Sequence, residues 1–422
     1  MSVHAIVGAQ WGDEGKGKLT DHLALQADLV VRFQGGCNAG HTIMLDGEPL
    51  ALHMLPCGVL HPHVHNVLAS GVALDVDQLM RELADLSALG VHPRLTVSKR
   101  AQLVMPYHRR RDVLEEQRLG AAAFGSTRVG MAPCLGDKHL KIGLTVAHLF
   151  DSGALRERLE HALDIQRVLL GGLYAEQADA LEELVRLAEG WAESLDGLVD
   201  DTEALMARAQ ANGKRVLLEG QLGALRDPDQ GIYPYVTSSS TLAGYACVGA
   251  GIAARDLRRV TAVTKAYSSA VGAGPFACEL AGQAAERLRA RGNEYGATTG
   301  RPRRVGYFDA VATRHGARAQ GADELALTLL DVLDDLEEIP LCVGYSIDGE
   351  ARDDFPPMPE LARARPRYET MRGWRAPTRG ARRLEDLPAP ARAYVERVEE
   401  LVGIPVGWLS VGREREATFA TR

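Results

Sequence analysis

The strand-like run Ala5-Ile-Val7 leads into Gln10-Trp-Gly-Asp-Glu-Gly-Lys-Gly-Lys18, a glycine-rich loop that carries acidic and basic side chains together. Its three glycines allow positive φ values and a close approach of the backbone to a ligand, so that successive N–H groups converge on phosphate oxygens. A helix that begins near Lys18 would direct its N-terminal amides and dipole at the same anion. The stretch therefore predicts a phosphate-binding loop at the end of a first strand.

This loop differs from a P-loop at two positions. Gln10 stands where the first glycine belongs, and Gly17 follows Lys16 where a Ser or Thr belongs. The loop has instead Asp13, a carboxylate among the phosphate-binding glycines that can ligate a cation or accept a proton. An ordinary glycine-rich turn with solvated charges is the alternative interpretation.

The composition is that of a globular protein, with 422 residues, 46% hydrophobic and 25% charged, and a net charge of -8. The negative balance argues against a general nucleic-acid binder. No CxxC pair indicates a zinc knuckle or a disulfide framework, because the cysteines are scattered: Cys37, Cys57, Cys134, Cys247, Cys278 and Cys342. No signal peptide or long apolar stretch is evident, so we expect a cytoplasmic protein that does not enter a membrane.

Short β-branched runs such as Leu29-Val-Val31 and Val260-Thr-Ala-Val263 alternate with longer segments of helical period. This alternation predicts an α/β fold with a large, mostly parallel central sheet and flanking helices. Residues 151–212 are almost continuously helical in character, with leucines repeating on one side. We therefore expect a single catalytic domain over residues 1–422 with an inserted helical subdomain at 151–212.

A second glycine-rich segment, Gln34-Gly-Gly-Cys-Asn-Ala-Gly-His-Thr42, follows the strand-like run ending at Phe33. Two such loops after two strands predict one shared pocket. His41 is the natural proton carrier or phosphate partner there, because its reference pKa lies near neutrality. A structural histidine with satisfied hydrogen bonds is the alternative.

Two further segments are rich in donors. Ala297-Thr-Thr-Gly-Arg-Pro-Arg-Arg304 suits the recognition of a carboxylate or phosphate, although an exposed basic loop would have the same composition. The hydroxyl cluster Tyr235-Val-Thr-Ser-Ser-Ser-Thr241 could bind a phosphate, and capping of a helix would explain it equally well. Both segments are candidates for the same pocket.

Taken in order, the motifs resemble those of the adenylosuccinate synthetase family, and they span nearly the whole chain. They are Gln10 to Lys18, Gln34 to Thr42, Tyr233-Pro-Tyr-Val-Thr-Ser-Ser239, Val271-Gly-Ala-Gly-Pro-Phe276, Gly296-Ala-Thr-Thr-Gly300, Tyr368-Glu-Thr-Met371 with Gly373-Trp374, and Glu399 to Pro405 before Ser410. The resemblance implies a fold related to the P-loop proteins and a Mg²⁺-dependent C–N ligase of purine nucleotide biosynthesis.

In that family a nucleoside triphosphate, GTP, phosphorylates the 6-oxygen of inosine monophosphate (IMP), and the amine of L-aspartate then displaces the phosphate. By resemblance, Asp13 would remove the N1 proton, and His41 would stabilise or protonate the phosphoryl side. Mg²⁺ would bind the Asp13 carboxylate and the Gly40 carbonyl. Positioned acid–base groups of this kind contribute about 10²–10⁴-fold to a rate.

The resemblance also assigns ligands residue by residue. The triphosphate would be bound by Gly12, Asp13, Glu14, Gly15, Lys16, Gly17, Lys18, Gly40, His41, Thr42, Arg303, Asp331, Ser410 and Gly412. The purine monophosphate would be bound by Asp13, Lys16, Asn38, Ala39, Gly40, His41, Thr127, Lys141, Leu222, Thr237 and Arg301. Aspartate would be bound by Ala297, Thr298, Thr299, Gly300, Arg301 and Arg303. Family members are generally homodimers, and Lys141 would reach the neighbouring site.

Several departures from the family pattern fall at these ligand positions. The glutamine expected to contact the purine is Leu222, and Gln221 would replace it only if the turn shifts. The family's Thr-Gly-Arg-Gly-Ile-Gly-Pro is Thr127 to Pro133 in altered form, with Val129 at one changed position. Three basic positions also change: an arginine becomes Lys141, an arginine before Val271 becomes Ala270, and the lysine of Thr-Lys-Leu-Asp becomes Leu329.

Loss of a hydrogen-bonding partner in a polar site can shift substrate discrimination by as much as ~10⁴–10⁵, so these departures concern specificity more than reaction type. One alternative is therefore a diverged paralogue that uses GMP or dGMP, or ATP in place of GTP. A non-catalytic nucleotide-binding regulator is an alternative from another class, although retention of Asp13 and His41 argues against it. A dehydrogenase is excluded by the lack of a GxGxxG loop with a downstream acid.

Overall fold

The computed structural model describes residues 2–295, 300 and 302–422. Its centre is a ten-stranded sheet in the order β20-β19-β15-β11-β1-β10-β2-β5-β7-β9. In that order the strands are Thr418–Ala420, Val406–Ser410, Glu324–Thr328, Leu257–Lys265, Ser2–Gly8, Arg215–Glu219, Leu29–Arg32, His65–Leu68, Arg94–Ser98 and Val199–Asp200. Within this sheet every pair is parallel apart from β19 with β20. The predicted parallel sheet is confirmed.

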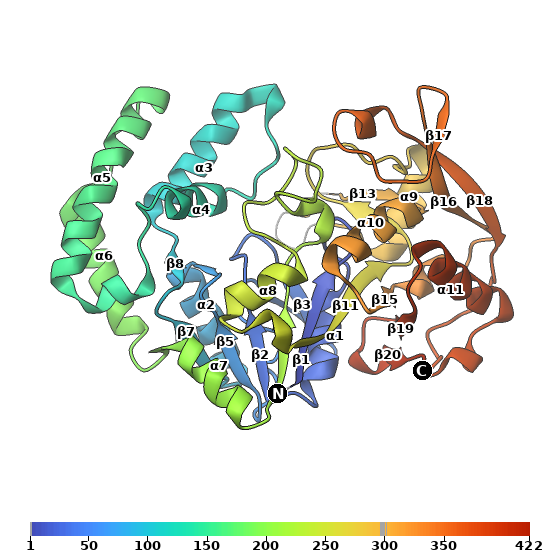
Figure 1. Ribbon diagram of the computed structural model, residues 1–422, viewed down its shortest axis with the longest axis horizontal. Helices are drawn as coiled ribbons and strands as arrows, with labels where there is room; N and C mark the ends of the chain where they lie inside the picture. Colours follow the sequence, from blue (N-terminus) through green and yellow to red (C-terminus); the bar gives the residue numbers. More distant parts are fainter. Residues whose placement is uncertain (1, 296–299, 301) are drawn as a thin grey trace.

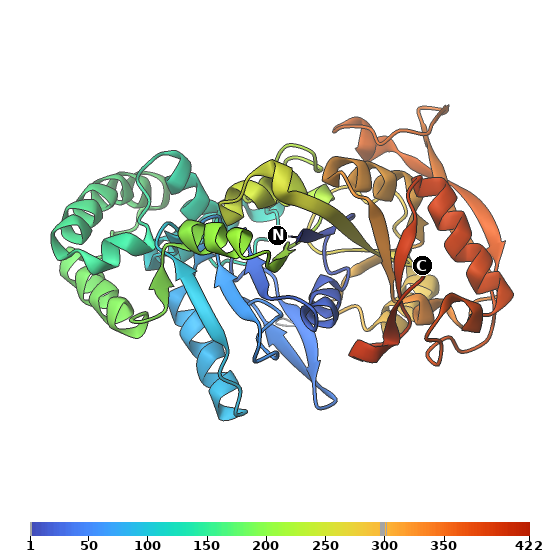
Figure 2. The ribbon, with the colours of Figure 1, turned by 60° about the horizontal axis from the view of Figure 1, so that its bottom comes forward.

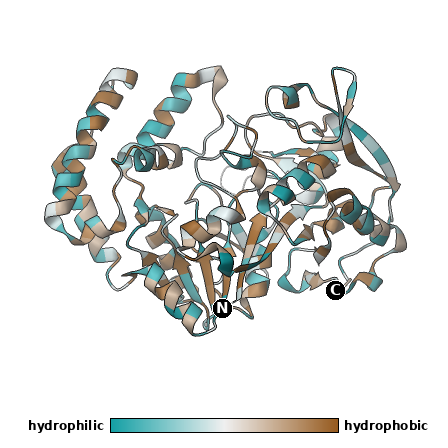
Figure 3. Cartoon of the chain, viewed as in Figure 1, coloured by the Kyte–Doolittle hydropathy of each residue, from teal (hydrophilic) through white to brown (hydrophobic). Residues whose placement is uncertain are grey.

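Helices cover the sheet on both sides (Figures 1 and 2). They are α1 (Lys16–Ala24), α2 (Val76–Ala88), α7 (Thr202–Ala211), α8 (Ala243–Ala250), α9 (Gly282–Gly292), α10 (Ala310–Gln320) and α11 (Ala389–Val402). The strands are accordingly apolar along their length, as Figure 3 shows, and β2 and β5 are buried at every position. Parallel strands with both faces covered give such continuous runs, in place of an alternating pattern.

A helical lobe lies beyond the β7 end of the sheet, at the left of Figure 1. It contains α3 (Pro106–Leu119), α4 (Met131–His139), α5 (Ser152–Tyr174) and α6 (Leu181–Ser194). Buried polar groups hold it together: the Asp137 carboxylate accepts from His108 at 3.1 Å and from Arg111 at 2.8 Å. Within residues 151–212, β9 joins the main sheet and α7 contacts β7 and α8. The division into one domain with an insertion stays a prediction.

Smaller sheets surround the central one. A mixed sheet at the right of Figure 1 contains β14 (Phe308–Asp309), β16 (Glu338–Ile347), β17 (Glu350–Arg352) and β18 (Arg365–Arg372). Three short pairs complete the fold: β3 (His41–Leu45) with β4 (Glu48–Leu52), β6 (Ala73–Leu74) with β8 (Gln102–Leu103), and β12 (Ser268–Ala270) with β13 (Arg304–Gly306). All six cysteines are buried and unpaired. Among the described residues, none of the helices combines the length and apolar character needed to span a bilayer.

Helix α10 packs directly on the residue that follows β1, and Gly316 makes this approach possible. A Cβ atom at Gly316 would lie 1.8 Å from the backbone oxygen of Ala9 and 3.2 Å from Ala224 Cβ. Because the obstacle is backbone, it cannot rotate away. The close contact fixes the start of the glycine-rich loop against the helix layer.

We therefore expect Gly316→Ala to lower the free energy of unfolding by about 1–3 kcal/mol, as overpacking does elsewhere. The matched control is Gly190→Ala in α6, where a Cβ meets nothing within 4 Å. That substitution should raise stability by about 0.5–1 kcal/mol, because alanine restricts the unfolded chain more than glycine does. Urea unfolding of both variants is the measurement, and equal stabilities for the two would contradict the packing argument.

Candidate active site

The first glycine-rich loop connects β1 to α1 at the carboxyl edge of the sheet, as predicted. Gly12 and Gly15 have φ values of 103° and 92°, and Asp13 lies in the left-handed region at 57°. The buried Glu14 carboxylate accepts hydrogen bonds from the backbone N–H groups of Gln10 (3.1 Å) and Gly12 (2.9 Å). Lys16, also buried, forms an ion pair with Glu14. Both residues were assigned to the triphosphate, and the structure shows them holding the loop in shape.

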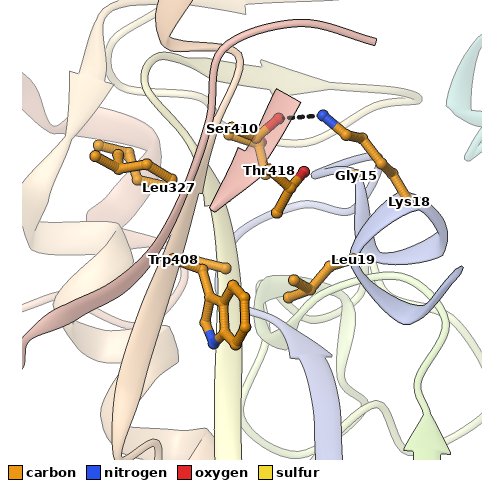
Figure 4. A pocket seen from close by; sticks show the side chains of 10 residues that line it. Gly15, Lys18, Leu19, Leu327, Trp408, Ser410 and Thr418 are labelled. Atoms are coloured by element: carbon orange, nitrogen blue, oxygen red, sulfur yellow. Dashed lines mark hydrogen bonds between the residues drawn. The ribbon is translucent and has the colours of Figure 1, made fainter. Parts of the chain in front are cut away.

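Lys18 extends from α1 toward the C-terminal segment (Figure 4). Its ammonium donates to Ser410 Oγ at 2.5 Å and to the Gly412 carbonyl at 2.6 Å. Burial lowers the pKa of Lys18 to about 8, although the nearby Asp331 carboxylate opposes this shift. The structure therefore brings together four residues from the triphosphate list, Lys18, Asp331, Ser410 and Gly412, from three distant parts of the sequence.

His41 lies on the other side of the loop, at the start of β3, and is almost fully buried. Its Nδ1 is 2.5 Å from Glu219 Oε1 at the end of β10, and the second oxygen of Glu219 accepts from the Cys57 amide at 2.8 Å. Burial lowers the pKa of His41 even though Glu219 opposes the shift. Burial would raise the pKa of Glu219, but the hydrogen bond from His41 and the Arg32 charge hold it below its usual range. The short contact and these two directions fit an imidazole that donates from Nδ1 to the Glu219 carboxylate.

Both polar atoms of the Gln221 side-chain amide have hydrogen-bond partners within the chain. Its side-chain oxygen accepts from the Gly36 amide at 3.0 Å, and its nitrogen donates to the carbonyls of Gly36 (2.9 Å) and Ala39 (3.0 Å). The Gln221 amide is therefore engaged in shaping the 34–39 loop. Leu222, with φ of 60°, packs its backbone and side chain beside Gly12.

Arg303 links the acid of the loop to a buried network. Its Nε lies 3.1 Å from Asp13 Oδ2, and its Nη1 lies 3.0 Å from Glu294 Oε2. Glu294 also accepts from Lys265 Nζ and Tyr267 Oη, each at 2.5 Å. Burial would lower the pKa of Arg303, but the Asp13 and Glu294 charges outweigh it and raise the pKa. Asp13, the proposed base, therefore lies next to the Arg303 guanidinium, and Glu294 holds that guanidinium in position.

Asp331 follows β15, next to Leu329, which has a φ of 58°. One Asp331 oxygen lies 3.1 Å from Arg379 Nε. The other, Oδ1, is buried and has no hydrogen-bond partner in the described part of the chain. A buried carboxylate oxygen without a donor indicates a place for a ligand N–H group.

The remaining predicted residues are distributed around the two loops. Asn38 has a buried side-chain oxygen without a partner among the described residues. Thr237 donates its amide to the Arg226 carbonyl at 2.8 Å, while Thr42, Thr127, Lys141 and Gly300 are exposed. Of the aspartate-loop predictions, Ala297, Thr298, Thr299 and Arg301 lie outside the described residues.

The predicted metal ligands offer a suitable donor set. Asp13 is about a quarter exposed, with its Oδ2 beside Arg303, and Gly40 is half-buried next to the His53 ring. A carboxylate and a backbone carbonyl are the oxygen donors that Mg²⁺ takes alongside phosphate oxygens and water. The residues present therefore fit Mg²⁺.

Sequence reasoning missed Glu219, Glu294 and Arg226. Glu219 ends an apolar strand, and an acid at the carboxyl end of a parallel strand is a signal for a site at that edge. Glu294 lies in a loop and Arg226 ends the short 3-10 helix Ala224–Arg226, both without any distinctive local pattern, and only their long-range partners reveal them.

Comparison with known proteins identifies the family that has this arrangement of loops. A family model described as adenylosuccinate synthetase matches residues 5–419. The adenylosuccinate synthetase of Caldanaerobacter subterraneus subsp. tengcongensis is 44% identical over 426 residues, covering 100% of both chains, and that of Saccharopolyspora erythraea is 45% identical over 422 residues, covering 99% of both. The fully ligated adenylosuccinate synthetase structure from Plasmodium falciparum aligns over 100% of both chains with a TM-score of 0.93 and 34% identity.

A second solved structure shares the fold alone. It is the cyanophage S-2L succinoaminodeoxyadenylate synthetase bound to dGMP and dATP, with a TM-score of 0.61 and 20% identity over 100% of this chain and 95% of the phage chain. Fold, loops and relatives together define a C–N ligase of purine nucleotide biosynthesis. The chain belongs to the adenylosuccinate synthetase family.

The role of Gln221 can be tested by stability. Gln221→Ala leaves the buried Gly36 amide without its acceptor and removes a donor from the carbonyls of Gly36 and Ala39, so we expect the free energy of unfolding to fall by about 1–3 kcal/mol. The control is Gln26→Ala on the surface, which should stay within about 0.5 kcal/mol of the wild type. If urea unfolding gave the same small change for both, Gln221 would not be anchoring the 34–39 loop.

Proposed function

We propose that this chain joins L-aspartate to the 6-position of IMP, with GTP and Mg²⁺, through a 6-phosphoryl intermediate. One observation carries the proposal: Asp13 lies within a phosphate-binding loop, beside Arg303. Pure nucleotide binding needs no acid at that position, whereas a 6-oxopurine must lose its N1 proton before its oxygen becomes a nucleophile. The retained acid therefore supports catalysis over the regulatory alternative.

In the first step Asp13 takes the N1 proton, and the electron pair moves through the ring to the 6-oxygen. That oxygen attacks the γ-phosphorus, and the bond to the β–γ bridging oxygen breaks to leave GDP. In the second step the amine of aspartate attacks carbon 6, inorganic phosphate leaves, and the amine loses a proton. Phosphoryl transfer depends largely on alignment and charge stabilisation, so the loop amides and Lys18 would bind the phosphates.

His41 is suited to the phosphoryl side. Burial keeps it neutral on its own, but the negative charge of a triphosphate would favour the imidazolium form, and Glu219 would stabilise that form from Nδ1. The ring would then donate from Nε2 to a phosphate oxygen. Mg²⁺ held by Asp13 and the Gly40 carbonyl would supply further positive charge at the transferred group.

Asp331 supports GTP over ATP. Guanine presents two adjacent N–H donors, at N1 and at the 2-amino group, which pair with the two oxygens of one carboxylate. Adenine presents an acceptor at N1, which would face the carboxylate acceptor without a proton to share. The buried Asp331 Oδ1 without a partner among the described residues fits the guanine edge, even though Leu329 replaces the family lysine.

The names of the relatives support IMP as the monophosphate. The curated relatives at 44–45% identity are adenylosuccinate synthetases, whereas the phage enzyme bound to dGMP is only 20% identical. GMP and dGMP are therefore the less favoured alternatives. Aspartate would bind the segment that ends at Arg303, with Thr298, Thr299, Gly300 and Arg301 as its contacts.

We further propose a cytoplasmic homodimer in which Lys141 reaches the neighbouring site. The helical lobe exposes large apolar side chains close to Lys141 and along α5, with Leu140 67%, Val168 71% and Leu173 58% exposed. Exposed apolar surface of this kind is typical of a protein interface. Six unpaired cysteines are what a reducing compartment maintains.

The assay for the function combines aspartate and Mg²⁺ with IMP, GMP or dGMP and with GTP or ATP, and follows inorganic phosphate and the succinylated product. We expect turnover with IMP and GTP. Turnover only with a guanine monophosphate would overturn the IMP assignment, and no turnover in any mixture would favour the regulatory alternative. Asp13→Asn should lower kcat by at least about 10²-fold if Asp13 is the base.

The pKa of Lys18 predicts a pH dependence of triphosphate binding. Because burial lowers this pKa to about 8, Lys18 is charged at pH 7 and loses its proton as the pH rises through 8. Phosphates favour the ammonium form, so binding of GTP above pH 8 should take up close to one proton, and the affinity should fall by up to about tenfold per pH unit.

Calorimetry in buffers of different ionisation enthalpy measures this uptake at pH 7 and pH 9. Lys18→Arg is the matched control, because a guanidinium stays charged throughout and should abolish the uptake at pH 9. An identical uptake in the wild type and Lys18→Arg would show that another group is responsible.

A further inference from the structure

Two arginines hold the glycine-rich segment 271–274 through its backbone carbonyls. Arg226 donates to the carbonyls of Val271 and Ala273, the latter at 3.4 Å. Arg304 donates to the carbonyls of Gly272 (3.4 Å) and Gly274 (2.7 Å). The segment is bent, with φ values of 81° at Gly272 and 109° at Gly274, and the two guanidinium groups together hold all four of its carbonyls.

Arg226 ties this segment to a second loop. Its Nη1 also donates to the Tyr235 carbonyl at 2.6 Å, and its own carbonyl accepts from the Thr237 amide at 2.8 Å. The guanidinium and the backbone of one residue thus position both ends of the stretch 235–237. Thr237 is one of the residues proposed to hold the purine monophosphate.

A third loop joins the same arrangement. The Phe124 carbonyl accepts from the Ala273 amide at 3.3 Å, and the Phe124 and Tyr235 rings meet edge to face with centroids 6.0 Å apart. Phe124 precedes Thr127, another residue proposed for the monophosphate, by three positions. Segment 271–274 therefore contacts two other loops: Arg226 joins it to segment 235–237, and the Ala273 amide joins it to Phe124. Those two loops carry Thr237 and Thr127, both proposed to hold the monophosphate.

Arg226 is a buried cation, 9% exposed, that makes no ion pair among the described residues. Burial, together with the nearby Arg304 charge, lowers the pKa of Arg226 to about 10, although Asp13 opposes the shift. A buried charge without a counter-ion is costly, so its position within the field of Asp13 suggests that it serves the site.

The position of Arg226 also bears on a departure noted in the sequence. The family arginine before Val271 is Ala270 in this chain, and Ala270 is buried in an apolar cluster with Leu225 and Phe276. Arg226, the residue after Leu225, delivers a guanidinium to the adjacent Val271 carbonyl from a different part of the chain.

We propose that Arg226 is a positioning residue of the purine monophosphate site, which clamps segment 271–274 to segment 235–237 and supplies the guanidinium that the family carries at position 270. This inference rests on the proposed function, because it assumes that these loops bind IMP. It assigns to Arg226 no contact with the reacting atoms.

The test measures kcat and KM for IMP and GTP separately. Arg226→Leu should raise KM for IMP by about 10–100-fold, the range expected for lost charge-assisted hydrogen bonds, and leave KM for GTP within about twofold. Arg226→Lys, which has one ammonium for three carbonyls, should give an intermediate KM for IMP. The double variant Arg226→Leu with Ala270→Arg should return KM for IMP to within about threefold of the wild type.

Arg156→Leu is the control, because Arg156 pairs with Glu182 on the exposed surface of the helical lobe. It should leave both KM values unchanged. If Arg226→Leu folds poorly, the lysine variant and the double variant still report on the clamp. Equal effects on IMP and GTP, or no effect on either, would overturn the positioning role, and failure of the double variant to recover would overturn the relocation. Turnover by the wild type reports on the proposed function independently.

Discussion

Buried carboxylates that accept hydrogen bonds from the backbone fix the loops around the site. Glu14 holds the first loop through the amides of Gln10 and Gly12, and Glu219 holds the chain at Cys57. Asp227 accepts from the amides of Asp229, Gln230 and Thr241. Glu116 accepts from those of Phe124 and Gly125. Glycine-rich loops at the carboxyl edge of a parallel sheet have no ladder to satisfy their amides, so internal acids do so.

These acids also determine the charge of the site. A cation offsets the negative charge of several buried acids: Lys16 pairs with Glu14, and Lys265 and Arg303 pair with Glu294. Arg303 Nε lies beside Asp13, and the Asp13 charge also acts on the buried guanidinium of Arg226. A chain with a net charge of -8 can therefore concentrate positive charge where phosphates and a dicarboxylate would bind.

The sequence predicts the sheet and the two glycine-rich loops well, because both depend on local signals. Apolar runs of strand length mark buried parallel strands, and clustered glycines mark backbone that a ligand approaches. Glu219 and Arg226 were not predicted, because their roles depend on partners far away in the chain, such as His41 for Glu219 and Val271 for Arg226. Gln221 shows the same limit: one position along a loop separates a purine contact from a loop anchor.

Two of the departures from the family pattern lie where the backbone has a positive φ value. Leu222 and Leu329 both have φ values near 60°, which branched apolar residues rarely adopt, at positions where the family has an amide and a lysine. Such conformations persist only where the surroundings enforce them. Two contacts hold Leu222 in this conformation: the Gly12 backbone packs against it, and the side chain of the preceding Gln221 is hydrogen-bonded to the Gly36 carbonyl. The loop framework is therefore kept while the side chains on it change, and on the proposed function such changes, Arg226 among them, would alter how the purine is held.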